Sequence, residues 1–196
     1  MVRLLMPADY RSMPWKNGGG RTTEIATHPP GASLDTFLWR ASLADVGCDG
    51  PFSPFPGVDR TIVLLDGAGM RLREGPRDVA LTTPFAPHEF SGDEAVDCAL
   101  VAGPVRDFNA MFRRGRARGS IAVARGSTLK LGPARFRLAY AAAGAHECTV
   151  ARLAPLRLEA GHALVVDETG GSDGCLIAIR PLGAGAVALV VSVDCP

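Results

Sequence analysis

Apolar residues along this chain recur in short runs that glycine and proline interrupt. The chain has 196 residues with 23 Gly and 15 Pro, so most uninterrupted windows are too short for a typical helix. In FLWRASLADV at 37–46, Phe37, Trp39 and Leu43 alternate in position with Leu38 and Arg40. This period of two is typical of a β-strand.

The same kind of short segment appears repeatedly after residue 60. RTIVLLDGAGMRLRE at 60–74 predicts a β-hairpin, because glycines at its centre permit a tight turn. Further strands are predicted over 94–102, 134–142, 148–153, 162–167, 174–180 and 186–193. Many short strands separated by regular turn signals are typical of a sandwich or barrel, so we predict an all-β fold.

One segment follows a helical pattern instead. In RDFNAMFRRG at 106–115, Phe108, Met111 and Phe112 are spaced as on one face of a helix, which Gly115 could end. We therefore interpret Asp107 and Asn109 just before and within it as capping residues. The segment would connect two halves of the chain.

Composition narrows the class of protein. Hydrophobic residues make up 47% of the chain and charged residues 21%, which indicates a compact globular protein. A formal net charge of +1 gives no overall attraction to nucleic acid or an anionic membrane, and the basic run at 113–118 is interpreted as a solvated face or a dimer edge. We expect no nucleic-acid partner.

Cysteine usage and hydropathy bear on location. The five cysteines are widely spaced and include no C-x-x-C pair, so we interpret them as reduced thiols in the cytoplasm. No apolar run approaches the roughly 18 residues that a membrane-spanning helix needs, so we expect no membrane association. Exposed edge strands of a β-rich fold could be covered by a second copy of the chain, and a homodimer remains an open expectation.

The first candidate site lies in PWKNGGGRTTEIA at 14–26. Three consecutive glycines allow close approach of the backbone to a ligand, and the residues around them offer donors and an aromatic wall that could hold a carboxylate. The candidate ligand-binding residues here are Trp15, Lys16, Asn17, Arg21 and Glu24. The alternative interpretation is a glycine-rich turn with a structural tryptophan and solvated charges.

A second cluster spans 39–60. Arg40 and Ser42 share a strand face opposite Trp39, so they would point outward or into the interior of a barrel. The loop after this strand adds Phe52, Ser53 and Arg60 in a segment stiffened by proline. Its alternative interpretation is a rigid connection with aromatic plugs.

His88 completes the candidate ligand-binding set. The four histidines are scattered and form no H-x-H or H-x-x-x-H pair, so we expect no bound metal, and we expect no other cofactor. His88 is interpreted as a hydrogen-bonded or ligand-contacting residue. No G-x-S-x-G motif is present, and we assign no catalytic residue.

Four segments in order, PWKNGGGRTTEIA, WRASLADVGCDGPFSPFPGVDRTIVLLDGAGMRL, PFAPHEFSGD and GPVRDFNAMFRR, closely resemble the HutD/Ves family of bacterial proteins. The resemblance covers about residues 3–118. It implies a cupin-like (RmlC-like) double-stranded β-helix or jelly roll without a metal, arranged as a compact bicupin over 1–196 with one or two short helices. Its halves would be 1–115, with the main site, and 116–196.

The resemblance also implies a connection with histidine utilisation. The intermediates of histidine breakdown are carboxylates, so the expected function is a sensor or governor that binds formylglutamate, formiminoglutamate or urocanate through cationic side chains. Two alternatives stay open. One is a cofactor-independent hydrolase or isomerase that uses Glu24 or His88 as acid or base, and the other is a protein-interaction module.

Overall fold

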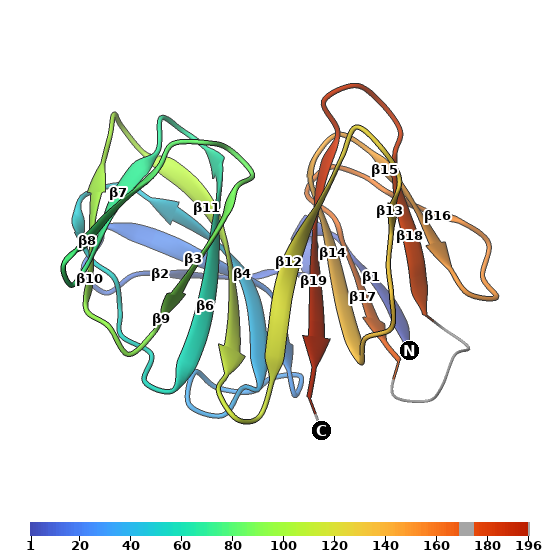
Figure 1. The fold of residues 1–196 in the computed structure, drawn as a ribbon, viewed down its shortest axis with the longest axis horizontal. Coiled ribbons are helices and arrows are strands. Elements are labelled where there is room, and N and C mark those ends of the chain that lie inside the picture. The colour runs from blue at the N-terminus through green and yellow to red at the C-terminus, as the bar shows by residue number, and fades with distance from the viewer. Residues whose placement is uncertain (169–174, 196) are drawn as a thin grey trace. The chain divides into compact units, whose positions relative to one another are not determined.

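The computed structural model describes residues 1–168 and 175–195, whose regular structure is almost entirely β-strand (Figure 1). The chain divides into two compact units. Arg11–Ala117 form what we call the first unit, and Met1–Tyr10 with Arg118–Pro196 form the second unit. The predicted boundary near residue 115 lies close to this division, but the first ten residues belong with the later part of the chain.

The first unit contains two sheets. A six-stranded sheet has the order β2-β3-β4-β11-β6-β9 and a four-stranded sheet the order β5-β10-β7-β8, with every pairing antiparallel. The strands are β2 (Arg11–Pro14), β3 (Gly20–His28), β4 (Trp39–Val46), β5 (Gly50–Pro51), β6 (Val58–Asp66), β7 (Met70–Glu74), β8 (Arg77–Leu81), β9 (Pro87–Ser91), β10 (Val96–Leu100) and β11 (Val105–Arg113).

The second unit repeats this layout of a larger and a smaller sheet. Its five-stranded sheet has the order β1-β17-β14-β19-β12 and its four-stranded sheet the order β13-β18-β15-β16. The strands are β1 (Val2–Leu5), β12 (Arg118–Arg125), β13 (Leu129–Lys130), β14 (Phe136–Ala143), β15 (His146–Val150), β16 (Leu156–Leu158), β17 (Ala163–Asp167), β18 (Leu176–Pro181) and β19 (Val187–Asp194). The predicted all-β class is confirmed.

Most predicted strands are present with small shifts at their ends. The segments predicted over 37–46, 94–102, 134–142, 148–153, 162–167, 174–180 and 186–193 correspond to β4, β10, β14, β15, β17, β18 and β19. Residue 174 lies outside the described residues. Burial alternates along β10 and β15, whereas β4, β14, β17 and β19 are buried on both faces. Short β-rich runs bounded by turn residues predict the strands of this second kind.

The predicted hairpin at 60–74 is wrong as a pairing, although both of its arms are strands. β6 pairs with β11 and β9 in the larger sheet, whereas β7 pairs with β10 and β8 in the smaller one. The turn between them is a corner from one sheet to the other. Gly67 and Gly69 have φ of 95° and 106°, and a Cβ at Gly69 would lie 2.5 Å from the Leu81 carbonyl oxygen, so the corner requires glycine.

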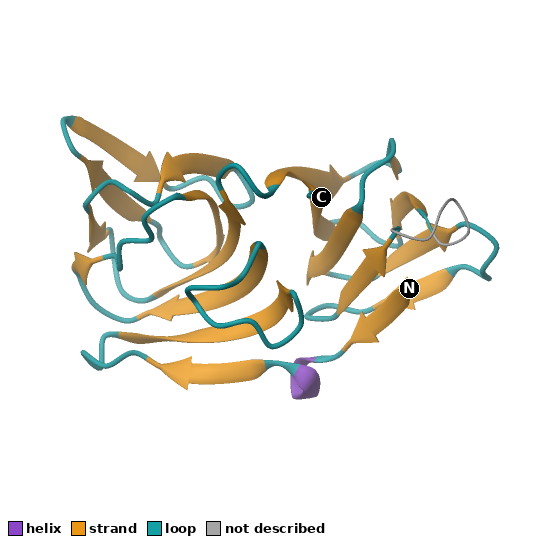
Figure 2. Ribbon diagram, turned by 90° about the horizontal axis from the view of Figure 1, so that it is seen from below, coloured by secondary structure: helices purple, strands orange, loops and turns teal. Residues whose placement is uncertain are grey.

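The helix predicted over 106–115 is also wrong, because this segment is strand β11. Phe108, Ala110 and Phe112 occupy one face of the strand and are buried, while Asp107 and Asn109 on the other face are buried as well. A strand buried on both faces hides its period of two, and the remaining apolar spacing then resembles a helix. Among the described residues the single helical element is a 3-10 turn, η1 (Pro7–Asp9), drawn in purple in Figure 2.

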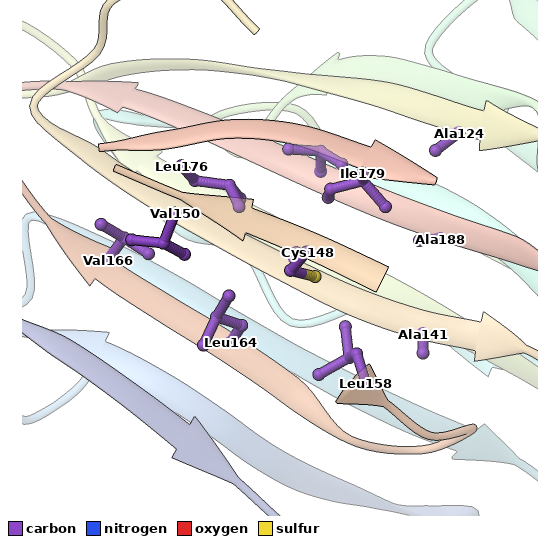
Figure 3. Packing of buried hydrophobic residues seen from close by; sticks show 12 residues of the cluster. Ala124, Ala141, Cys148, Val150, Leu158, Leu164, Val166, Leu176, Ile179 and Ala188 are labelled. Carbon is purple, nitrogen blue, oxygen red and sulfur yellow. The ribbon is translucent and has the colours of Figure 1, made fainter. Parts of the chain in front are cut away.

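The interior of the second unit is apolar. Cys148 and Val150 from β15 and Ile179 from β18 face Leu164 and Val166 from β17, as Figure 3 shows. Arg137 on β14 is buried beside a carboxylate. Its guanidinium donates to the Ser192 hydroxyl at 2.6 Å and to the Gly132 carbonyl, and its Nε lies 3.5 Å from Glu168 Oε1 without a hydrogen bond among the described residues. This buried charge therefore has a counter-ion within its own unit.

No helix in residues 1–168 and 175–195 is long and apolar enough to cross a membrane.

His146 at the start of β15 makes stability sensitive to acid. Its side chain is fully buried, neither ring nitrogen has a hydrogen-bond partner within the described part of the chain, and burial lowers the pKa of the imidazole. Below the unfolded pKa of about 6.5 the unfolded state binds more protons than the folded state, so the free energy of unfolding falls as pH falls. We expect His146→Leu to flatten this loss and to stabilise the protein by about 1–3 kcal/mol near neutral pH.

Thermal denaturation of the parent protein and His146→Leu between about pH 7.5 and pH 5 would test this. The gap between the two melting temperatures should widen as pH falls. A gap that stays constant with pH would contradict the role given to His146. His162→Leu, outside any strand and less buried, is the matched control.

Candidate functional site

The six-stranded sheet of the first unit has a face that packs on the four-stranded sheet, which we call the inner face. Ile62 and Leu64 from β6 and Phe90 from β9 cluster there with Met70 and Leu72 from β7. Side chains alternate along a strand, so every second residue of β4, β6, β9 and β11 points the same way. The strand register then identifies the other inner-face residues.

Three neighbouring rows cross the inner face. The first row is Arg40, Met111, Arg60 and Phe90; the second is Glu24, Ser42, Asn109, Ile62 and His88; the third is Ala44, Asp107 and Leu64. Seven of these side chains are polar or ionisable. We call Glu24, Arg40, Ser42, Arg60, His88, Asp107 and Asn109 the inner polar set.

Arg40 already has a carboxylate partner. Its Nε donates to Glu24 Oε2 at 2.7 Å, and its Nη1 donates to the Ser42 hydroxyl at 3.4 Å. The Arg40 side chain is 5% exposed and that of Glu24 is 20% exposed. This charge is therefore compensated inside the unit, and Glu24 serves as its counter-ion.

Arg60 is buried without a carboxylate partner among the described residues. Its guanidinium lies over three rings, with centroids of Phe52, Phe55 and Phe90 at 5.6, 5.3 and 4.7 Å. Its Nη1 donates to the Ser53 carbonyl at 3.3 Å, while its Nε has no hydrogen-bond partner among the described residues. Burial, and secondarily the nearby Arg40 charge, lowers the pKa of Arg60 to about 10, although the Asp107 charge opposes this.

Asp107 and Asn109 are buried acceptors on β11. Neither Asp107 Oδ1 nor Asn109 Oδ1 has a hydrogen-bond partner in the part of the chain that the structure describes. Burial raises the pKa of the Asp107 carboxyl from 3.8 to about 7, against the lowering effect of the Arg60 charge. No ion pair within 4 Å joins Arg60 and Asp107 among the described residues, so two opposite charges share this interior without contact.

His88 is held by a carboxylate from the other sheet. Its Nε2 lies 2.5 Å from Oε1 of Glu74, which is fully buried on β7. The second oxygen, Oε2, lies 3.3 Å from the Arg77 guanidinium but without hydrogen-bond geometry. The His88 ring also stacks on Phe90, with 6.1 Å between centroids. These contacts fix the imidazole at the edge of the inner polar set.

The glycine-rich segment is a tight turn between β2 and β3. Gly18 has φ of 71°, and a Cβ at Gly20 would lie 2.3 Å from the Asp45 carbonyl oxygen. Lys16, Asn17 and Arg21 are exposed, and Asn17 Oδ1 accepts from the Gly19 amide at 3.0 Å. The glycines are thus explained by close packing of the turn, and these three predicted residues do not join the inner polar set.

The remaining predicted residues surround the inner polar set or lie near it. Trp15 and Phe52 are partly buried against the first unit's core, and Trp15 Nε1 donates to the Thr22 hydroxyl at 2.8 Å. Ser53 is exposed and contributes its backbone carbonyl to Arg60. The structure therefore brings together Glu24, Arg40, Ser42, Arg60 and His88 of the predicted residues.

Three residues of this interior were not among the predicted site residues. Asp107 and Asn109 are not helix caps, because no helix forms there, and they point to the inner face of β11. Glu74 is buried in phase with Met70 and Leu72. A carboxylate in phase with buried apolar residues of a strand is the sequence signal that could have revealed Glu74.

No group of three His, Cys, Asp or Glu side chains is placed to hold a metal ion within residues 1–168 and 175–195.

Comparison with known proteins places the chain in a family. The HutD family model matches residues 7–181. The chain belongs to the HutD family. An uncharacterized 21.2 kDa protein in the hutC 3′ region of Pseudomonas putida is 40% identical over 76% of this chain and 78% of its own length. Protein Ves of Cronobacter sakazakii is 38% identical over 75% of this chain and 81% of its own length.

Solved structures agree with this family and with the fold. HutD from Pseudomonas fluorescens SBW25 (formate condition) matches with a TM-score of 0.81 and 32% identity over 100% of both chains. More distant structures, including Ylba from E. coli at 10% identity and a TM-score of 0.63, have the cupin fold. This HutD-family chain therefore has a cupin-like fold, in a family linked to histidine utilisation.

Asp107 is expected to make the free energy of unfolding fall as pH rises. Its pKa is about 7 in the folded protein against 3.8 ordinarily, so the folded state binds more protons between these values. The isosteric Asp107→Asn removes this titration. We expect the variant to gain roughly 2–4 kcal/mol over the parent protein on going from about pH 4 to pH 8.

Urea denaturation at several pH values measures this difference. The charged groups that act on Asp107 are Arg60 and Asp45, and Asp66→Asn, at the exposed end of β6, is a control that should follow the parent protein. A difference between parent and Asp107→Asn that does not change with pH would contradict the prediction.

Proposed function

We propose that this protein binds a small carboxylate of histidine catabolism, such as formylglutamate, formiminoglutamate or urocanate, and acts as a sensor or governor of that pathway. The ligand's carboxylate would bind at Arg60 and Arg40 on the inner face of the first unit. Phe52, Phe55 and Phe90 would surround the cationic end of the site. Side chains alone would hold the ligand, without a metal.

The observation that carries the proposal is the condition of Arg60. A buried guanidinium ordinarily has a carboxylate partner, because an unpaired buried charge is costly. Arg60 instead has one carbonyl contact, an Nε without a hydrogen bond among the described residues, and a second cation, Arg40, near enough to affect its pKa. A carboxylate ligand would supply the missing acceptors and reduce the repulsion between the two cations.

The contrast with the second unit supports the choice of site. Arg137 there is as buried as Arg40, but a hydroxyl, a carbonyl and Glu168 surround its guanidinium. The Nε of Arg137 also lacks a hydrogen bond among the described residues, but Arg137 has a carboxylate within 4 Å, which Arg60 lacks among those residues. The first unit is the one in which an anion would complete the set of interactions.

Calorimetric titration with the three named compounds would test the proposal. We expect at least one saturable heat in the parent protein, and about 10- to 100-fold weaker binding in Arg60→Met or Arg40→Met, because each loses a charged hydrogen-bond donor. Arg71→Met, an exposed arginine on β7 of the same unit, should bind like the parent protein.

Absence of binding by all three compounds at millimolar concentration would contradict the proposal, as would equal losses in Arg71→Met and Arg60→Met. Melting temperatures of the variants serve as a check that each one remains folded.

A hydrolase or isomerase acting on a related metabolite is a second candidate, favoured by the contact between His88 and Glu74. A buried carboxylate that fixes an imidazole at 2.5 Å is an arrangement suited to a general acid or base. Recovery of unchanged compound after long incubation would favour binding alone. Turnover that His88→Gln abolishes while binding persists would favour the enzyme.

A further inference from the structure

The inner polar set has an unequal distribution of hydrogen-bond donors and acceptors. The first row carries the two guanidinium groups, Arg40 and Arg60, which can only donate. One and two steps farther along β11 lie Asn109 and Asp107, each with an oxygen that accepts no hydrogen bond from the described residues. The first row of the inner polar set therefore carries the hydrogen-bond donors, and the second and third rows carry the unpaired acceptors.

The spacing follows from strand geometry. Residues on one face of a strand are separated by about 6.6 Å, since each residue advances the chain by about 3.3 Å. Asn109 is one such step from Met111, which stands between Arg40 and Arg60 in the first row, and Asp107 is one step farther. Long arginine side chains shorten the distance that a ligand has to span.

Asp107 Oδ1 has no hydrogen-bond partner among the described residues. Its row-mates on β4 and β6 are Ala44 and Leu64, which offer no hydrogen-bond donor. The Arg60 charge acts on it electrostatically, yet the two groups form no ion pair within 4 Å in the described part of the chain. Burying a carboxyl oxygen without a hydrogen-bond donor costs free energy, and a hydrogen bond from a ligand's N–H group would recover part of that cost.

We propose that the site selects carboxylates that also carry an N–H donor, with the carboxylate at Arg60 and Arg40 and the N–H group directed to Asp107 and Asn109. This proposal rests on the proposed function and adds the second half of the ligand. Amides, amidines, imidazoles and primary ammonium groups all qualify as the donor. A dicarboxylate of the same length without an N–H group would leave the β11 oxygens unpaired.

A series of five-carbon dicarboxylates that differ only at C2 provides the test. Glutarate carries CH2 there and 2-oxoglutarate carries C=O, whereas L-glutamate carries an ammonium group and N-formyl-L-glutamate an amide N–H. Calorimetric titration of the full chain with each compound gives four dissociation constants. We expect at least one compound of the N–H pair to bind 10-fold or more tightly than both compounds that lack the donor, as is usual when a buried acceptor is left unpaired.

Replacing the acceptors Asp107 and Asn109 tests whether these residues cause the preference for compounds with an N–H group. Asp107→Leu and Asn109→Leu keep the branched shape of the side chain and remove the oxygens, so the preference should shrink to less than about threefold while glutarate affinity stays within about threefold of the parent value. Two variants are used so that the result does not depend on the folding of either one. Asp66→Leu, on the exposed end of β6, is the matched control.

The outcomes separate this inference from the proposed function. Equal binding of all four compounds, still lost in Arg60→Met, would overturn the donor requirement and leave the carboxylate site standing. Equal weakening of all four by Asp107→Leu would also overturn it, because Asp107 would then act through Arg60. Failure of these four compounds, and also of formiminoglutamate and urocanate, to bind would remove both proposals.

Discussion

The buried guanidinium of Arg60, which has no carboxylate partner among the described residues, dominates the electrostatics of the first unit's interior. Arg60 is enclosed by three phenylalanine rings, which orient its charge but offer no strong acceptor. The surrounding apolar core of the first unit cannot solvate it either. Arg40, which pairs with Glu24, and Asp107 lie on the same inner face, and the charges of Arg40 and Asp107 both act on Arg60.

The two units have the same layered arrangement of sheets, but they differ in how a buried arginine is accommodated. In the second unit, apolar residues such as Leu158, Leu164 and Val190 fill the space between the sheets. Among the described residues of this unit, Arg137 is the one buried arginine, and Glu168 of the same unit is its counter-ion. In the first unit, the corresponding sheet carries polar residues on three adjacent rows. Similar strand arrangements thus hold a mainly apolar interior in one case and an interior with polar residues on three rows in the other.

The sequence alone predicts the class of fold well, since short apolar runs bounded by glycine and proline predict strands even where both faces are buried, as in β4 and β19. It fails at β11, because Asp107 and Asn109 are buried polar residues on a strand whose other face is apolar, and the pattern left behind resembles a helix. It fails also at the corner after β6, because sequence proximity suggests a hairpin whereas the two arms belong to different sheets. Local pattern contains no information on which sheet a strand joins.

For the site, the sequence predicts the strand residues better than the loop residues. Arg40 and Ser42 follow from alternation with Trp39, and the structure places them on the inner face. Lys16, Asn17 and Arg21 were predicted from the chemistry of a glycine-rich segment, whose glycines are in fact needed for close backbone packing. In a turn, the type of a residue does not reveal where its side chain points, whereas in a strand the position of a residue determines the face on which its side chain lies.

The first strand of the chain pairs with one that lies far along the sequence: β1 joins β17 with Val2 opposite Val166. The whole of Arg11–Ala117 is therefore inserted between two pieces of the second unit. During synthesis on the ribosome, β1 emerges long before its partner β17. By the time β17 emerges, all strands of the inserted unit have already been synthesised. The topology thus favours an order of assembly in which the first unit is complete first, and its compact folding shortens the loop that β1 must close to reach β17.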